Sequence, residues 1–396
     1  MSAKFEQALQ GLFAKGTAAL LMGGLMVAGP ATAAEVKFKS SGGLKWETDD
    51  GKASGQFGGR LMLDANYYDE DVVDTHENGL EFRRLRMEAK ASYLDYGIAL
   101  QFDFADAEGG DDVALKDAYI YKKALGGKII AGHYKQPFGL EELTSSKYIT
   151  FMERSFSGIP LAHSLGFAYT TSADNYTFTV SGYDPDSSGD ENGNTDDGIG
   201  FGGRATYAPH IDAGNVTHFG IAVASESDMD RYRVRPRIGH LASRTVLMDV
   251  QGLNDVDVTK LGLEAALVRG PFSAQAEYMQ ANADSSSGNQ DETTSAYYVY
   301  GSYFLTGEAR PYKTSSGAFD RVKPINESGA WEIGLRFEGA ENDDTDAEAE
   351  AWTVGLNYYA NPYVRWMFNV VKGELTPAGG PTDEPTAFLA RFQLDF

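Results

Sequence analysis

The sequence predicts an all-β protein, a transmembrane antiparallel β-barrel of about 16 strands. Three observations lead to this fold class. Apolar residues recur at every second position through much of the chain, which is the period of a β-strand and not of a helix. Tight turns alternate with long polar connections, a pattern typical of barrels that cross a membrane. The chain also closes on an alternating aromatic segment that ends at Phe396.

The first residues of the chain have the pattern of an export signal. Lys4 and Lys15 precede a short apolar stretch, residues 16–29, and small residues follow it. Basic residues, an apolar core and a small-residue site of the A-x-A type form a Sec signal peptide. The apolar core is shorter than the roughly 20 residues that span a bilayer. We therefore predict a signal peptide over residues 1–33 and one mature domain over residues 34–396.

Composition restricts the class of protein further. The chain carries 57 acidic and 34 basic residues, a formal charge of −23, and no cysteine. An exported protein without cysteine has no disulfide framework. The acidic balance argues against a nucleic-acid partner, and no linker or fixed-period repeat divides the chain. These features indicate a single domain.

Six segments carry the alternation that predicts the barrel. In each, apolar residues occupy one parity and polar or small residues mostly occupy the other. In hydrocarbon every backbone N–H and C=O must be paired, so a β-protein spans a membrane only as a closed barrel. About 16 strands leave an aqueous lumen rather than a packed core. The six segments are residues 85–93, 98–104, 331–337, 352–358, 364–370 and 388–396.

The connections between the predicted strands are of two kinds. Residues 125–127 and 359–362 are tight, and we assign them to short periplasmic turns. Tyrosines cluster near predicted strand ends, as at residues 297–300, where aromatic girdles meet the membrane interfaces. Four further segments are long and acidic, and we assign them to extracellular loops. They are residues 69–79, 184–198, 283–293 and 341–350.

Arginines gather in three segments of this acidic chain. Guanidinium groups that line a pore favour anions, because their fork offers paired hydrogen bonds to phosphate or carboxylate. The alternative is an arginine row that orders the water of the lumen without strict selectivity, and both interpretations stay open. The last three of these arginines share one parity and so point to one side of an extended segment. The arginines are Arg60, Arg83, Arg84, Arg86, Arg233, Arg235 and Arg237.

Other chemistries find little support in the sequence. The segment that begins with Asp184 and Asp186 resembles the first half of a calcium loop, but the closing glutamate would fall at Thr195. We therefore expect no metal site and no cofactor. No nucleophile motif accompanies the histidines, so we expect no enzyme activity. The histidines are His76, His133, His163, His210, His218 and His240.

Several segments resemble the phosphate-selective porin O and P family of Gram-negative bacteria. The resemblance covers nearly all of the mature chain, and GPFSAQAEYM and LTGEARPYK are its most specific parts. It implies a 16-stranded barrel, assembled as a trimer, with an inward-folded loop that forms a constriction and an arginine ladder that guides anions. The segments are residues 58–69, 82–93, 138–155, 233–239, 262–279 and 303–313.

The resemblance also assigns roles by position. The constriction loop corresponds to residues 138–155 and includes Lys147. Phosphate-specific members carry a lysine where this chain has Glu142, and a second central lysine of the family falls at about Gly97. Lys116 stands where the family has an acidic residue. The ladder falls on Arg60, Arg83, Arg84, Arg233, Arg235 and Arg237, and Lys313 matches a lysine of the family's pore.

Together these residues predict an outer-membrane porin through which small solutes diffuse passively. We expect it to pass phosphate or other small anions with relaxed phosphate specificity, because Glu142 puts a carboxylate where phosphate would be held. The expected partners are these anions, outer-membrane lipid and further copies of the chain in a homotrimer. Two alternatives stay open: a weakly selective general porin, and a plugged barrel with a structural or adhesive role.

Overall fold

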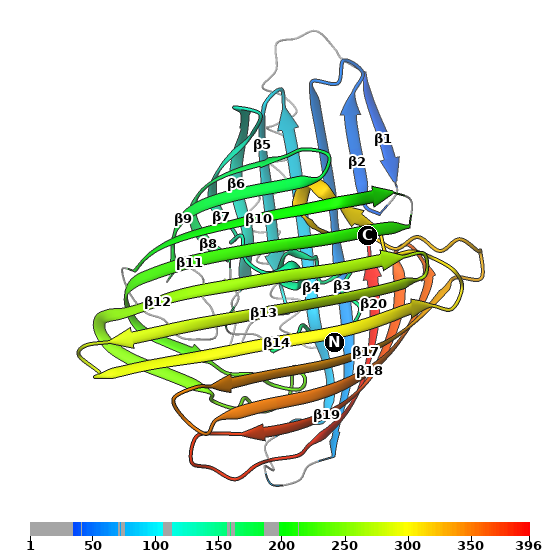
Figure 1. The fold of residues 1–396 in the computed structure, drawn as a ribbon. Coiled ribbons are helices and arrows are strands. Elements are labelled where there is room, and N and C mark those ends of the chain that lie inside the picture. Colours follow the sequence, from blue (N-terminus) through cyan, green and yellow to red (C-terminus); the bar gives the residue numbers. More distant parts are fainter. Residues whose placement is uncertain are drawn as a thin grey trace, which may run out of the picture.

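A computed structural model describes residues 35–40, 42–69, 72, 76–105, 113–156, 159, 163–185, 198–212 and 214–396. The predicted signal peptide lies outside these residues. Within them, sixteen antiparallel strands form a closed barrel, which confirms the predicted fold class and strand number (Figure 1). The last strand closes the barrel by pairing with the first, from Thr386 opposite Asp69 to Asp395 opposite Arg60.

Each strand of the barrel pairs with its neighbours along the chain. The strands are β3 (Ala53–Asp69), β4 (Gly79–Tyr93), β5 (Tyr96–Asp103), β6 (Ala114–Ala124), β7 (Gly127–Lys135), β8 (His163–Ser172), β9 (Tyr176–Asp184), β10 (Ile199–Asp212), β11 (Asn215–Val234), β12 (Met248–Arg269), β13 (Phe272–Ser285), β14 (Gln290–Phe304), β17 (Ala330–Asn342), β18 (Glu348–Asn361), β19 (Val364–Thr376) and β20 (Thr386–Asp395).

The distribution of apolar and polar side chains is the reverse of that in a water-soluble protein. On β18, Trp352 and Val354 point outward and are about half exposed, whereas Thr353 and Asn357 point inward and are 1% exposed. The same alternation repeats on the other strands, with large apolar residues outside and polar residues inside. An apolar outer surface suits hydrocarbon, and a polar inner surface suits a lumen that holds water and ions.

A β-bulge between β3 and β4 brings two consecutive arginines to the inner side. Met62 pairs with Arg84, but the next residue, Leu63, pairs with Phe82, so Arg83 is the extra residue. Arg84 is 4% exposed and lies against Met62. Arg83 donates two hydrogen bonds to Glu153, which belongs to a loop inside the barrel. Strict alternation would have sent one of these arginines into the lipid.

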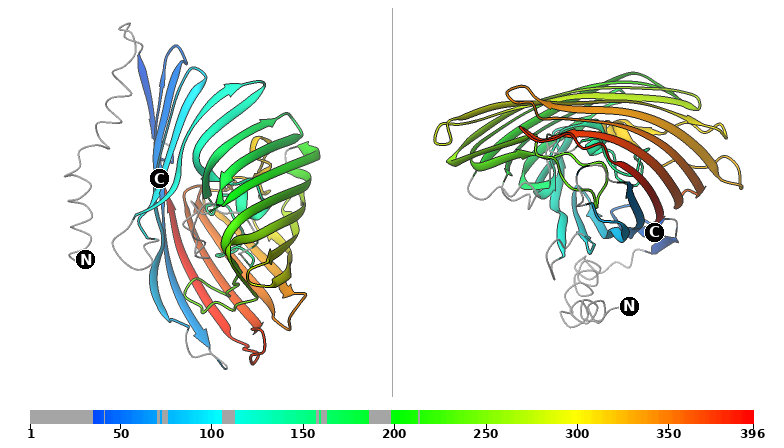
Figure 2. Two further views of the ribbon diagram at one scale, coloured as in Figure 1. Left: turned by 90° about the vertical axis from the view of Figure 1, so that its left-hand side faces the viewer. Right: turned by 90° about the horizontal axis from the view of Figure 1, so that it is seen from below.

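A short hairpin extends the barrel wall at the N-terminal side. It consists of β1 (Val36–Ser40) and β2 (Leu44–Thr48), and β2 pairs with the beginning of β3, where Leu44 lies opposite Phe57. Figure 2 shows this hairpin beyond the point where the C-terminal strand ends. No helix in the described ranges is long and apolar enough to cross a membrane.

The two ends of the barrel differ in their connections, as predicted. At one end, which we call the turn end, tight connections such as 94–95, 125–126 and 270–271 join successive strands. The opposite end, the loop end, carries all four acidic segments. The predicted loops 283–293 and 341–350 are shorter than expected, because β13, β14, β17 and β18 extend into these acidic residues. Only residues 286–289 and 343–347 of these two segments lie between strands. Large parts of the other two segments, 69–79 and 184–198, lie outside the described residues.

The connection between β7 and β8 folds into the barrel. We call residues 136–156 the inner loop; it contains a single helical turn, α3 (Leu140–Leu143). Phe138, Leu140 and Phe151 in this loop are at most 1% exposed. Its backbone is bonded to side chains of β13, β17, β18, β19 and β20, so the loop lies against that part of the wall.

One long connection enters the barrel from the turn end, where the sequence predicted only short turns. Residues 305–329, which we call the crossbar, join β14 to β17 and contain β15 (Tyr312–Lys313), η2 (Thr314–Ser316) and β16 (Ala318–Phe319). Arg204 of β10 donates to the carbonyls of Ser316 and Gly317, and Asp395 of β20 binds the other end of the crossbar. Since β10 and β20 are eight strands apart in a barrel of sixteen, the crossbar spans the lumen.

Candidate functional site

Three arginines of the barrel wall fasten the inner loop. Arg391 of β20 donates to the Met152 carbonyl at 2.5 Å and to Glu153 at 2.6 Å. Arg365 of β19 donates to the carbonyls of Ile149 and Thr150, and Arg336 of β17 donates to the Glu153 carbonyl. The alternation placed all three on the polar face of their strands, but the sequence analysis did not assign them. These three arginines bind the inner loop, so their hydrogen-bond donors are used within the protein.

Carboxylates of the wall complete the fastening of the loop. Glu277 of β13 accepts the backbone N–H groups of Leu140 and Glu141 at 2.5 and 2.8 Å, and Glu338 of β17 accepts the N–H of Phe156 at 2.9 Å. Each of these bonds satisfies a backbone donor that the fold has removed from water. The loop is thus bound along its length to the lumen wall.

We expect Arg391 to be essential for the stability of this arrangement. It is 0% exposed and lies between Asp64 and Glu153. Substitution R391M leaves two carboxylates beside an apolar group, and removing one partner of a buried ion pair typically costs about 3–5 kcal/mol. The free energy of unfolding, measured by urea titration in lipid vesicles with tryptophan fluorescence, should fall by that amount. A value within 1 kcal/mol of the unsubstituted protein would contradict this expectation.

Two inward arginines form no salt bridge among the described residues. Arg60 is 5% exposed and donates to Ser146 at 2.6 Å, and Arg84 is 4% exposed with only the Met62 sulfur near one of its nitrogens. The Nε atom of each is buried without a hydrogen bond. Within the described part of the chain, no carboxylate forms a salt bridge with either. Because a buried charge without a counterion is costly, an anion that passes here gains free energy.

Their neighbours Arg83 and Arg86 are paired. Arg83 binds Glu153 through two nitrogens at 2.9 and 3.0 Å, and Arg86 binds Asp103 at 2.5 Å. Burial opposes the ionisation of Glu153, yet the neighbouring charges of Arg83 and Arg391 hold its pKa well below the usual range. The row of inward arginines on β3 and β4 therefore contains members in salt bridges, Arg83 and Arg86, and members without one, Arg60 and Arg84.

Glu142, the residue that departs from the family's lysine, is held by two cations. Lys135 of β7 forms an ion pair with its carboxylate, and Arg154 approaches it at 3.0 Å. Burial opposes ionisation, but Arg154 and Lys135 outweigh it, so the pKa of Glu142 lies below its usual value. Two cations and one carboxylate give a net charge of +1. The carboxylate is committed to these partners and does not stand alone in the lumen.

Lys147 of the inner loop is a titratable cation beside Arg60. Its Nζ lies 3.5 Å from a Glu88 oxygen. Burial, followed by the charge of Arg60, lowers the pKa of Lys147 to about 8, against the opposing effect of Glu88. A lysine is charged only below its pKa. The positive charge of this part of the lumen therefore decreases as the pH rises through about 8.

This titration leads to a prediction about pH. The anion preference of the channel, measured as a reversal potential in a salt gradient, should weaken between pH 7 and pH 9. Substitution K147M should make the preference lower at pH 7 and reduce its dependence on pH across this range. If the wild-type protein and K147M respond identically to pH, Lys147 does not contribute its charge to the conducting path.

Several lysines lie near one another where the crossbar passes the turn end of the barrel. Lys313, predicted from the resemblance, is exposed on β15 of the crossbar. It lies close enough to Lys128 for their charges to repel, as do Lys90 and Lys123. Four lysines in one place create a region of positive potential that attracts anions. The structure thus joins Lys313 to residues of β4, β6 and β7 that the sequence analysis did not assign.

The remaining predicted residues lie elsewhere. Arg233 shares a face of β11 with Arg231, which pairs with Asp249 at a partly exposed position, and the buried Tyr232 and Val234 occupy the opposite face. The structure does not bring Arg233 together with Arg60 and Arg84.

Arg235 and Arg237 follow the end of β11, in the connection that reaches across the loop end. Arg237 lines a surface cavity there with Glu77 and His240. Lys116 is the extra residue of a bulge between β5 and β6.

Comparison with known proteins decides the family. The sequence profile of the family described as "Phosphate-selective porin O and P" matches residues 56–396. The chain belongs to this family. Porin O of Pseudomonas aeruginosa is 29% identical to this porin over 92% of the chain and 93% of its own length. The barrel and the family place this porin in the outer membrane of a Gram-negative cell.

Solved structures share the fold at low identity. An anion-selective porin from Comamonas acidovorans has a TM-score of 0.60 and 13% identity, covering 87% of this porin and all of that chain. OmpT of Vibrio cholerae, in a structure described as a trimer form, has a TM-score of 0.54 and 13% identity, covering 86% of this porin and 99% of that chain. At such identities the likeness concerns the barrel alone.

Proposed function

We propose that this porin is a passive diffusion channel for small anions, phosphate among them, with weak phosphate specificity. The observation that carries the proposal is the pair Arg60 and Arg84, buried guanidinium groups that form no salt bridge among the described residues and whose Nε atoms lack a hydrogen bond. The name of the family and the anion selectivity of the Comamonas porin agree with anions as the solutes. No bond is broken during transport, and no catalytic role is proposed.

The proposed path follows the inner side of β3 and β4. It begins near Arg237 at the loop end, passes Arg83 and Arg84, and continues past Arg60 to the lysines at the turn end. The inner loop, including the predicted stretch 138–155, would form the constriction where it meets these strands, through the contacts of Ser146 with Arg60 and of Glu153 with Arg83. Positive groups at successive levels lower the free energy of an anion along the whole path.

Weak phosphate specificity follows from the environment of Glu142. Its carboxylate forms ion pairs with Lys135 and Arg154, two basic side chains that could otherwise bind the oxygens of phosphate. A single net positive charge attracts anions in general but provides few free donors for a tightly held oxyanion. We therefore propose that phosphate passes without blocking other anions.

Export and assembly complete the proposal. Residues 1–33 would direct export through the Sec pathway and be removed. The mature chain would assemble as a homotrimer in outer-membrane lipid; OmpT, a protein of the same fold, has a trimer form. Crosslinking of the protein in native membranes, followed by electrophoresis, should give a species of three copies.

Single-channel recording in planar bilayers tests the transport proposal. Under a potassium chloride gradient, the reversal potential should indicate preference for chloride, and millimolar phosphate should reduce the chloride current only slightly. A potential that favours potassium would refute anion transport. Strong block by micromolar phosphate would refute weak specificity, and the lack of any conductance steps would support the plugged barrel instead.

A further inference from the structure

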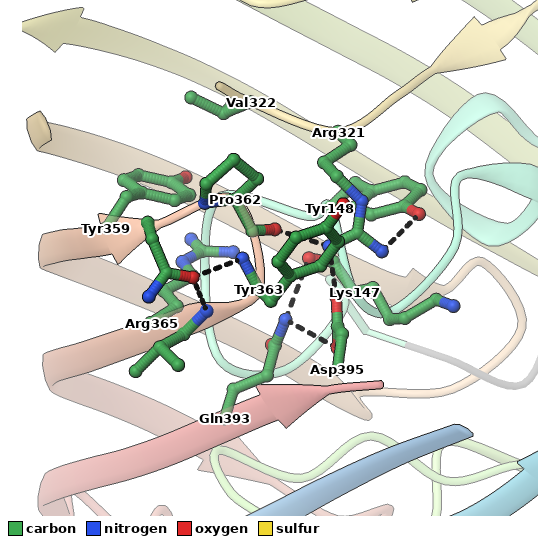
Figure 3. A pocket seen from close by; sticks show the side chains of 12 residues that line it. Lys147, Tyr148, Arg321, Val322, Tyr359, Pro362, Tyr363, Arg365, Gln393 and Asp395 are labelled. Carbon is green, nitrogen blue, oxygen red and sulfur yellow. Dashed lines mark hydrogen bonds and ion pairs between the residues drawn. The ribbon is translucent and has the colours of Figure 1, made fainter. Parts of the chain in front are cut away.

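The crossbar ends at a cluster of contacts centred on Arg321. One of its terminal nitrogens lies 2.9 Å from an Asp395 oxygen at the end of β20 and also donates to the carbonyl of Pro362 in the β18–β19 turn. The other terminal nitrogen donates to the Tyr148 hydroxyl of the inner loop at 3.1 Å. Figure 3 shows these partners around the cavity that they line. One side chain therefore joins the crossbar to the barrel end, a turn and the inner loop.

Aromatic rings hold the same guanidinium from its faces. The centroid of the Tyr148 ring lies 5.1 Å from Arg321, and that of Tyr363 lies 4.9 Å away. Arginine suits this position because its planar group can donate at its edge and stack on rings at its faces, which a lysine cannot do. The Asp395 side chain is 3% exposed, so the ion pair is shielded from water on that side.

The rest of the crossbar is held differently. Phe319 packs in an apolar cluster with Val216 and Val268 of β11 and β12, and Val322 packs with Phe304 and Tyr359. These contacts cover the flank of the crossbar that faces β11–β18. The other flank presents Lys313 to the lysines of β4, β6 and β7. The position of Lys313 therefore depends on how the crossbar is held.

We propose that Arg321 is a positioning residue that holds the β20 end of the crossbar across the lumen and thereby sets the width of the turn-end exit. The inference rests on conduction through the barrel but not on the sign of the permeant ion. Apolar packing and the hydrogen bonds of Arg204 and Arg310 hold the crossbar against β10–β14, whereas the Arg321 contacts fix its distance from β20. When they are lost, the crossbar moves away from β20 and the exit widens.

Two substitutions that remove opposite charges distinguish a positioning role of Arg321 from a direct effect of its charge on the permeant ion. R321A removes a positive charge and D395N removes a negative one, yet both break the same ion pair. Each should raise single-channel conductance by about 1.5-fold or more, and the double variant should raise it no further than the larger single effect. K323A, which removes an exposed positive charge two residues away, is the matched control and should leave the conductance within about 20%.

A second measurement reports the movement directly. The chain contains no cysteine, so V322C introduces a single thiol in the cavity wall, where Val322 is 6% exposed. A charged thiol reagent should modify V322C slowly alone and at least tenfold faster together with R321A. Equal rates, or a conductance that rises in R321A but falls in D395N, would overturn the proposal even if anion preference were confirmed. Cation preference in the unsubstituted protein would refute the proposed function and leave this inference standing.

Discussion

Replacing Arg60 and Arg84 together by methionine is expected to abolish the anion preference of the channel. The two guanidinium groups are buried and form no salt bridge in the described residues, so carboxylates farther away offset their charges only in part, and these charges act on the permeant ion. A unit charge about 8 Å away contributes roughly 2 kcal/mol at an effective dielectric constant of about 20. Losing that contribution should reduce the ratio of chloride to potassium permeability by at least about tenfold, since 1.4 kcal/mol corresponds to a factor of ten.

The reversal potential in a salt gradient measures this ratio, and stability provides a check on the interpretation. The R60M/R84M protein should keep most of its free energy of unfolding, because no buried carboxylate is left without a partner. K372M is a suitable control, since Lys372 pairs with Glu384 at positions that are more than half exposed. An unchanged permeability ratio in R60M/R84M would mean that the anion path does not pass these arginines.

Replacing Glu142 by glutamine should have the second-largest effect, in the opposite direction. E142Q keeps the size of the side chain but removes the negative charge between Lys135 and Arg154. We expect the chloride to potassium ratio to rise several-fold and phosphate to block the current at concentrations at least tenfold lower. Lys135 and Arg154 keep their bonds to carbonyls of the inner loop, so the loop should stay in place.

E142K extends the same test, because lysine is the residue that the family resemblance assigns to this position. It should strengthen phosphate block further unless the three cations push the loop aside, which would appear as a change in conductance. E348Q, at an exposed site on β18, removes an equal charge away from the lumen and should change neither property. If E142Q leaves phosphate block unchanged, relaxed specificity has another origin.

The barrel itself could be predicted from the sequence because its cause is local. Apolar and polar residues alternate at 352–358 and 364–370 because each strand there faces lipid on one side and water on the other. The strands near 283–293 were predicted less well. Beyond the membrane, polar residues can face either way, so alternation no longer marks where a strand ends.

The inward position of some candidate residues could be predicted from the sequence. Arg60 and Arg84 were proposed because an inward arginine in an apolar strand is conspicuous, and both side chains do lie inside the barrel. Arg336, Arg365 and Arg391 have the same local signature but hold the inner loop. Sequence alternation cannot separate the two groups of arginines. They differ in whether folding brings a carboxylate or carbonyl from a distant part of the chain close to the guanidinium group. The position of Arg233 was not foreseen either, since parity gives a shared side but not which side faces the lumen.

The sequence by itself determined the membrane barrel, its two kinds of ends, and the supply of inward cations, because each is encoded within one strand or one turn. Tertiary structure decided which cations are free. Glu142 is neutralised by Lys135 and Arg154, and the crossbar carries Lys313 to lysines far away in the chain. These outcomes depend on charges brought within a few ångströms by folding, and electrostatic interactions at such distances cannot be read from positions along a chain.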